Sequence, residues 1–224
     1  MGEYYNWVNV DRKEYICPNA FDFGNKEHES MRRRNAFLCA LRELLSKEWA
    51  GSHVFFMGDE KSIPAETDNE TLRILYGHTV KAGYPEDAFD TVIETYKNVS
   101  GLFNAAEAEV RQEIQFYLED VKNNTPMVRN EYGVDISKPY EGLFLRTGLD
   151  FRYTINHTKR ICYSFEDTRI LYLDHTENDI ADPLPILMGY GRVSETGAWV
   201  GDIIGVGNEM PDGYELLKEI FLDW

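Results

Sequence analysis

The chain has 224 residues, of which 39 are acidic and 23 basic, and its formal net charge is −16. A negative field of this size repels phosphate backbones and anionic lipids, so nucleic-acid binding and membrane docking are disfavoured. No apolar run approaches the roughly 20 residues that span a bilayer, and the N-terminus lacks the pattern of a secretory signal. Three cysteines without a CxxC pair disfavour a disulfide framework and structural zinc. We therefore expect a cytoplasmic globular protein without a cofactor.

Short strands and one long helix are expected in the first quarter of the chain. Aromatic and β-branched residues predict a strand over Tyr4–Val10, and Glu14–Cys17 is typical of the returning strand of a hairpin. Apolar residues at helical spacing predict a helix over Lys26–Trp49, which Gly51 ends. The apolar run His53–Met57 lies between two glycines and indicates a buried strand.

The middle of the chain is helical in pattern, and its last third returns to strands. Periodicity and capping residues predict helices over Thr67–Lys81, from Pro85 onward and over Asn104–Lys122. A further helix is expected from Asp212, after a polar loop over Asp174–Pro185. The strands in this part are expected at Phe151–Asn156, Ile161–Phe165, Ile170–Leu173 and Ile203–Val206. Together the elements predict an α+β fold in one domain, 1–224, with a mostly antiparallel sheet built from both ends of the chain and packed against helices from its middle.

Two segments of the sequence recur. Val8–Lys13 resembles Ile155–Arg160, because each places an asparagine before a basic pair. Trp49–Glu60 resembles Trp199–Glu209, because each reads Trp-x-Gly, then an apolar run, then Gly-Asp/Asn-Glu. The offsets, 147 and about 150 residues, agree. This pattern predicts either a pseudo-duplicated β unit, with repeat units 1–60 and 150–210 and a helical insert at 66–122, or two unrelated strand–turn signals.

Neither a resemblance nor a motif assigns an activity to the chain. The segments Trp7–Ile16 and Trp49–Glu60 resemble those of a family of uncharacterised bacterial proteins, and the similarity runs along most of the chain. That resemblance implies no activity. The sequence contains no phosphate-binding P-loop, no GxGxxG after a strand, no GxSxG elbow and no metalloprotease HExxH. Whether the protein is an enzyme is therefore left open.

The ends of the two recurring apolar runs carry the candidate ligand residues, Asp59, Glu60, Asn208 and Glu209. If the two halves pack about a pseudo-twofold axis, these oxygen-bearing side chains converge and suit Mg²⁺ or Ca²⁺. The alternative is that Gly-Asp and Gly-Asn simply make turns, because glycine tolerates positive φ and Asx side chains bond their own backbone.

Four further residues stand out in the recurring segments. Trp49 and Trp199 each precede a glycine and an apolar run, so they are either core anchors or the aromatic wall of a ligand pocket. Asn9 and Asn156 occupy the expected repeat turns.

The acidic residues are unevenly placed. Residues 86–123 contain nine acidic and three basic residues, and residues 174–224 contain eleven acidic and two basic ones. The leading hypothesis is an acidic binding protein, such as an immunity or regulatory protein, that docks a basic protein partner through electrostatic steering. One alternative is an unrecognised enzyme or a small-ligand or divalent-metal binding protein that uses the Gly-Asp/Asn-Glu strand ends. Another is an assembly protein that self-associates through its tryptophan-containing halves.

Overall fold

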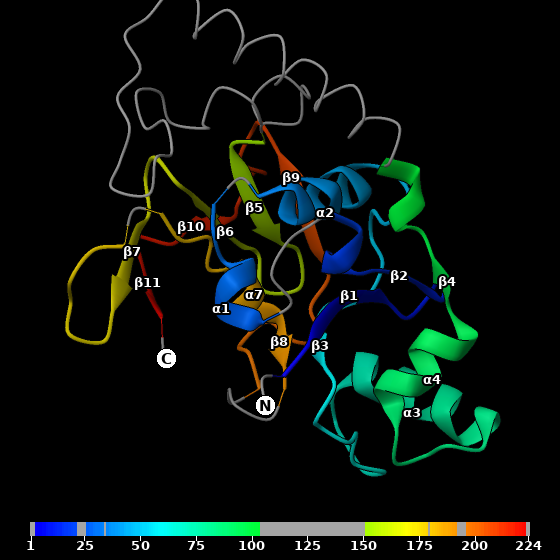
Figure 1. The fold of residues 1–224 in the computed structure, drawn as a ribbon. Helices are drawn as coiled ribbons and strands as arrows, with labels where there is room; N and C mark the ends of the chain where they lie inside the picture. The colour runs from blue at the N-terminus through cyan, green and yellow to red at the C-terminus, as the bar shows by residue number, and fades with distance from the viewer. Residues whose placement is uncertain are drawn as a thin grey trace, which may run out of the picture. The chain divides into compact units, whose positions relative to one another are not determined.

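The expected α+β fold is confirmed in the computed structural model, which describes residues 3–21, 26–33, 35–103, 151–178, 180–191 and 196–222. Within these ranges five α-helices accompany three sheets, in which most residue pairs are antiparallel and some are parallel (Figure 1). The sheets belong to one compact unit formed by Met1–Ser100 and Phe151–Trp224. The helix expected over Asn104–Lys122 lies outside the described residues, and the expectation of a single domain over 1–224 stays a prediction.

The first sheet is built mainly from the N-terminal part of the chain and has the strand order β4-β2-β1-β3-β8. Its central strand, β1, pairs antiparallel with β2 on one side and β3 on the other, while β4 and β8 join in parallel at the edges. The strands are β1 (Tyr5–Asn9), β2 (Glu14–Ile16), β3 (Val54–Gly58), β4 (Lys97–Asn98) and β8 (Gly189–Tyr190).

The second sheet comes from the C-terminal part of the chain and has the order β10-β6-β5-β9. Its strands are β5 (Tyr153–Asn156), β6 (Ile161–Ser164), β9 (Ile204–Gly207) and β10 (Glu215–Leu216). The third sheet is a parallel pair of β7 (Arg169–Tyr172) and β11 (Glu219–Leu222).

Two sets of four strands share one topology, as the predicted duplication requires. The strands β4-β2-β1-β3 have the same order, directions and register as β10-β6-β5-β9. Asn9 lies opposite Glu14 and Val54, and Asn156, 147 residues later, has the equivalent partners in β6 and β9. The parallel outer strands are also placed alike, since the first residue of each donates a backbone hydrogen bond to the equivalent turn carbonyl, Lys97 N to Lys13 O and Glu215 N to Arg160 O. We call these two sets of four strands the first and second repeats.

The two repeats meet at equivalent positions. An isolated antiparallel bridge joins His53 to Ile203, which are 150 residues apart and each precede the inner edge strand of their repeat. A contact between equivalent residues in opposite directions is what a pseudo-twofold axis produces. The strands β3 and β9 therefore lead away from the junction in opposite directions.

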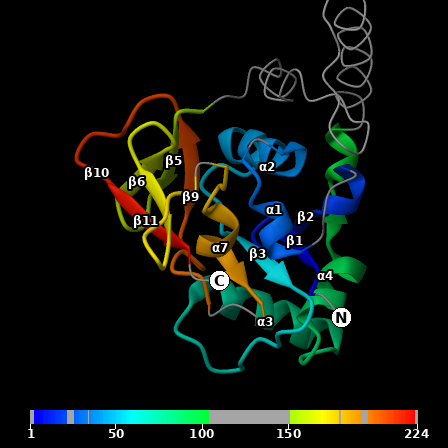
Figure 2. The same cartoon turned by 60° about the vertical axis from the view of Figure 1, so that its left-hand side comes forward.

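Helices pack on this pair of repeats. Helix α2 (Ala36–Ser46) lies against β9, so a helix of the first half covers the sheet of the second (Figure 2). Helices α3 (Glu70–Ala82) and α4 (Ala88–Thr95) pack on each other, and α1 (Glu27–Ser30) contacts α7 (Leu184–Met188). Two short 3₁₀ segments, Pro18–Phe21 and Ser100–Phe103, complete the described elements.

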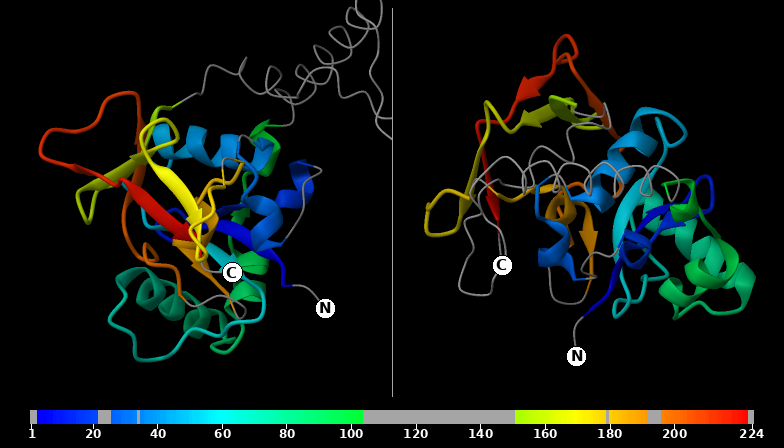
Figure 3. Two further views of the ribbon diagram at one scale, coloured as in Figure 1. Left: turned by 90° about the vertical axis from the view of Figure 1, so that its left-hand side faces the viewer. Right: turned by 45° about the horizontal axis from the view of Figure 1, so that its top comes forward.

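Two sequence predictions of helices are wrong. The helix expected over Lys26–Trp49 is divided into α1 and α2, because Asn35 caps α2 by accepting from Leu38 N at 2.8 Å and its amide donates to the carbonyls of Ser30 and Arg32. The helix expected from Asp212 is instead β10 and β11, and Figure 3 shows β7 and β11 side by side. Pairing with β6 and β7 outweighs the weak helical periodicity of this segment.

Candidate functional site

The duplication separates residues that the fold requires from residues that one repeat has and the other lacks. A residue type found at the same position in both repeats, with the same bonds, is explained by the shared architecture. A residue found in only one repeat is not required by that architecture.

Asn9 and Asn156 have the same structural role. Asn9 Oδ1 accepts from Arg12 N at 3.0 Å, and Asn156 Oδ1 accepts from Lys159 N at 2.9 Å. Both side chains are fully buried and close the hairpin turn of their repeat. The turns also share a basic residue at positive φ, which is Lys13 in the first repeat and its counterpart, Arg160, in the second.

Trp49 and Trp199 are both buried, with exposed fractions of 0% and 3%. The indole N–H of Trp49 donates to Glu14 Oε2 at 2.9 Å, while the ring of Trp199 lies 5.9 Å from that of Tyr163. Each tryptophan precedes a glycine at positive φ, Gly51 or Gly201, that turns the chain into the inner strand. These contacts place both indoles among the core side chains.

The strand-end residues of the two repeats are not brought together. Because β3 and β9 diverge from the His53–Ile203 bridge, their far ends are separated by roughly 30 Å at about 3.3 Å per residue. Strand register also makes Met57, rather than Gly58, the equivalent of Gly207.

Each strand end makes local bonds of its own. Asp59 exchanges two hydrogen bonds of 3.0 Å with the backbone of Tyr4, and Asn208 Oδ1 accepts from Arg152 N at 3.2 Å. Glu60 and Glu209 are exposed. Across the described ranges, no three His, Cys, Asp or Glu side chains are grouped so that they could hold a metal ion.

Three carboxylates at the N-cap and along α4 and one after β3 act on each other, and we call Asp59, Asp87, Asp90 and Glu94 the acidic patch. Asp87 caps the helix, because its Oδ1 accepts from Asp90 N at 3.0 Å. The negative charge of Asp87, with contributions from Glu94 and Asp59, raises the pKa of Asp90 above its ordinary value. Among the described residues no ion pair joins a member of the patch to a basic side chain. The patch is therefore a site of uncompensated negative charge.

A second feature distinguishes the first repeat. Asp11 Oδ2 accepts from both the backbone N and the ring Nδ1 of His53, at 2.8 and 3.0 Å. In the second repeat Thr158 Oγ1 accepts from the backbone N of Ile203 at 2.9 Å, and no imidazole is present. Both repeats therefore have the hydrogen bond from the backbone N to the turn side chain, whereas only the first repeat has the carboxylate–imidazole pair.

Another pair of titratable side chains lies near Asp11. His78 Nδ1 and the Tyr96 hydroxyl are 2.5 Å apart, and they join α3 to the end of α4. Burial, together with the charges of Lys13 and Lys81, lowers the pKa of His78. Burial and the charge of Asp11 raise the pKa of Tyr96 above its ordinary value. Asp11 therefore acts electrostatically on both pairs.

A carboxylate peculiar to the second repeat has a structural role. Asp202 Oδ2 accepts from Asn156 Nδ2 at 2.7 Å and from Lys159 Nζ at 2.6 Å. Ser52 occupies the equivalent position of the first repeat, and there the buried Asn9 Nδ2 finds no acceptor among the described residues.

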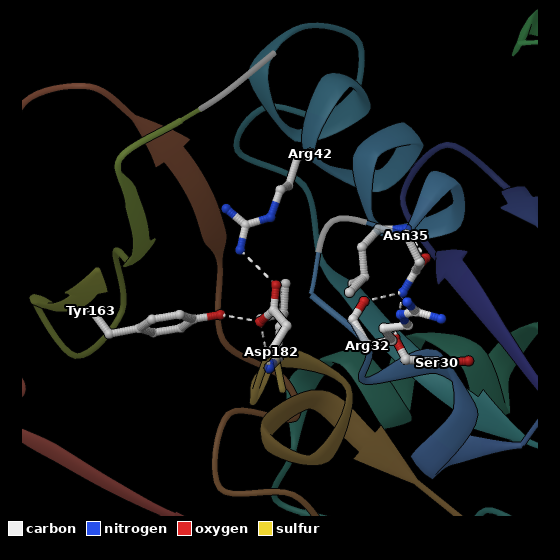
Figure 4. A network of polar contacts seen from close by, with 8 residues as sticks. Ser30, Arg32, Asn35, Arg42, Tyr163 and Asp182 are labelled. Carbon is white, nitrogen blue, oxygen red and sulfur yellow. Dashed lines mark hydrogen bonds and ion pairs between the residues drawn. The ribbon is translucent and has the colours of Figure 1, made fainter. Parts of the chain in front are cut away.

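A buried polar network joins the two halves of the chain (Figure 4). Arg42 of α2 donates to Asp182 Oδ2 at 2.7 Å, and the Tyr163 hydroxyl of β6 donates to Asp182 Oδ1 at 2.6 Å. Burial alone would lower the pKa of Arg42, but the charge and hydrogen bond of Asp182, together with Tyr163 and Cys39, outweigh burial and raise it. Burial and the same carboxylate raise the pKa of Tyr163 well above its ordinary value. The network fixes α2 on the second repeat, so we assign it to stability.

This network was not predicted from the sequence, although one signal was present. Arg42 lies four residues after Leu38 and three before Leu45, on the apolar face of its helix, where a cation needs a buried counter-ion. Asp182 lies in a segment that reads as a polar loop, and nothing local marks it as buried.

Comparisons with known proteins assign no family to the chain. No family model, curated protein or solved structure matches it. The resemblance noted from the two tryptophan-containing segments is therefore not supported by these comparisons. None of the described helices has the length and apolar character that crossing a bilayer requires.

Proposed function

We propose that the protein is an acidic binding protein that docks a basic protein partner, as an immunity or regulatory protein does, and that it works in the cytoplasm. The observation that carries this proposal is the acidic patch at α4. Crowded carboxylates raise the pKa of Asp90, so a nearby cation stabilises the ionised group and lowers the free energy of the complex.

The net charge of −16 supports the same proposal at long range. A field of one sign attracts an oppositely charged partner and raises the association rate, and salt screens this attraction over about 8 Å at physiological ionic strength. Complementary charge mainly affects association rate and partner choice. A basic partner is therefore expected to bind with a rate that falls as salt is added.

The test measures binding to the product of the gene that neighbours this one in its genome. The triple variant Asp87→Asn, Asp90→Asn and Glu94→Gln removes three charges from the patch, and asparagine at 87 retains the helix cap. We expect the association rate to fall at least tenfold in low salt, with a weaker dependence on salt.

A matched control removes three charges elsewhere. Glu209, Asp212 and Glu215 are exposed, and Glu209→Gln, Asp212→Asn and Glu215→Gln change the net charge by the same amount. If this control slows association as much as the patch variant, overall charge rather than the patch drives binding. A neighbouring gene whose product is plainly metabolic and does not bind would contradict the proposal.

The alternative of a divalent-metal or small-ligand site at the Gly-Asp/Asn-Glu strand ends stays a prediction. It is less well supported, because Asp59 and Asn208 lie at diverging strand ends. Titrating magnesium, calcium or manganese while following the melting temperature tests it, since a bound ligand stabilises the folded state.

A further inference from the structure

The Asp11–His53 pair has the geometry of an oriented base. An ionised carboxylate only accepts hydrogen bonds, so the 3.0 Å contact from Asp11 Oδ2 places the proton of a neutral imidazole on Nδ1. The lone pair is then on Nε2. The same carboxylate oxygen holds the backbone N of His53 at 2.8 Å, so ring and backbone are both fixed. The His53 side chain is 19% exposed, which leaves it accessible to a small molecule.

The second repeat shows that the fold does not need this pair. Thr158 and Ile203 stand at the positions of Asp11 and His53, and they keep the backbone hydrogen bond at 2.9 Å. The bridge between the repeats joins His53 to Ile203 directly, so both arrangements are compatible with the junction. Because the second repeat forms the same turn and strand start with threonine and isoleucine, the fold requires neither a carboxylate nor an imidazole at these two positions.

We propose that Asp11 and His53 form a general-base pair that hydrolyses small, neutral carboxylic esters. This activity goes beyond the proposed docking function and uses different residues. His53 Nε2 takes a proton from water as the water oxygen attacks the carbonyl carbon. The tetrahedral intermediate then expels the alkoxide, which recovers the proton from the imidazolium, so water and ester become acid and alcohol. Asp11 is a positioning residue that orients the ring.

The class of substrate follows from charge and access. The net charge of −16 disfavours phosphate esters and other anionic substrates, which leaves neutral esters as the better match. The limited exposure of the His53 side chain restricts the site to small acyl groups.

The test follows release of p-nitrophenol from p-nitrophenyl acetate by the full-length chain. His53→Ile is expected to lower kcat/KM by about 100-fold or more, which is the usual contribution of a positioned base. Asp11→Asn keeps an oxygen acceptor for the backbone N of His53, so it is expected to lower kcat with little change in KM or melting temperature.

Two controls separate chemistry from folding. The double variant Asp11→Thr and His53→Ile copies the second repeat and is expected to unfold like wild type while lacking the activity. His157→Gln removes an exposed imidazole whose Nδ1 lies 3.2 Å from a tyrosine hydroxyl rather than a carboxylate, and is expected to keep the activity. Wild-type hydrolysis in His53→Ile, or equal loss in His157→Gln, overturns the proposal. Absence of activity in the wild-type chain overturns it as well, without affecting the docking proposal.

Discussion

Replacing Arg42 with methionine should destabilise the protein strongly, because it leaves the Asp182 carboxylate buried without its cation. The Asp182 side chain is 1% exposed and that of Arg42 is 9% exposed. Removing one partner of a buried ion pair costs about 3–5 kcal/mol, whereas a surface pair is worth about 0–1 kcal/mol. Methionine retains most of the apolar stem, so the expected loss is mainly electrostatic. A loss of 3 kcal/mol lowers the folding equilibrium constant by roughly 150-fold.

The measurement is urea unfolding followed by both fluorescence and circular dichroism, so that coincident transitions support a two-state free energy. Tyr163→Phe is the matched comparison, because it removes only the hydroxyl bond to the same carboxylate and is expected to cost about 1.5–3 kcal/mol. The loss of unfolding free energy in the double variant should differ from the sum of the two single losses, because both side chains bind Asp182. A loss below about 1 kcal/mol in Arg42→Met would refute the assignment of a buried, structural ion pair.

Three further predictions concern residues of the repeats. Ser52→Asp should stabilise the protein by about 1 kcal/mol and raise its Tm by about 2–4 °C, because it supplies the acceptor that Asn9 Nδ2 lacks; a lower Tm would contradict this. Burial raises the pKa of Glu14, but hydrogen bonds from Arg12 and Trp49 outweigh it and hold that pKa below its ordinary value of 4.5. The stability that Glu14 contributes is therefore fully present above its unfolded pKa and is lost as the pH falls through its folded pKa. In Glu14→Gln the free energy of unfolding should fall less over this acidic pH range than it does in wild type. Gly51→Ala should cost about 1 kcal/mol from positive φ alone, and Gly201→Ala should cost more in the same urea assay, because its methyl group also meets the side chain of Asn69.

Most strands could be predicted from the sequence, because their signals are local. The strand expected over Tyr4–Val10 is observed at Tyr5–Asn9, and that expected over Ile161–Phe165 is observed at Ile161–Ser164. Alternating or continuous apolar runs between turn residues fix such short strands without reference to distant parts of the chain. The shared offsets of Asn9/Asn156 and Trp49/Trp199 likewise predicted the duplication, since they mark the turn and the core of each copy.

The features that could not be predicted depend on partners far away in sequence. The segment after Asp212 reads as helical, yet it becomes strands because β6 and β7 offer unpaired edges. The burial of Asp182 depends on Arg42, which is 140 residues away. The convergence expected of Asp59 and Asn208 depended on the direction of the pseudo-twofold axis, which places the starts of β3 and β9 together and their ends apart.

Comparing the two repeats also shows how freely negative charge varies on this fold. The turn retains a basic residue in both copies, as Lys13 and Arg160, but Asp11 of the first repeat is matched by Thr158 and Glu14 by Ile161. The hairpin register is the same with and without these carboxylates, so the architecture does not demand them. Asp11 is therefore available for interaction or chemistry, whereas Glu14 accepts a hydrogen bond from the indole of Trp49. We therefore expect function at Asp11–His53 and at the acidic patch rather than at the residues that both repeats share.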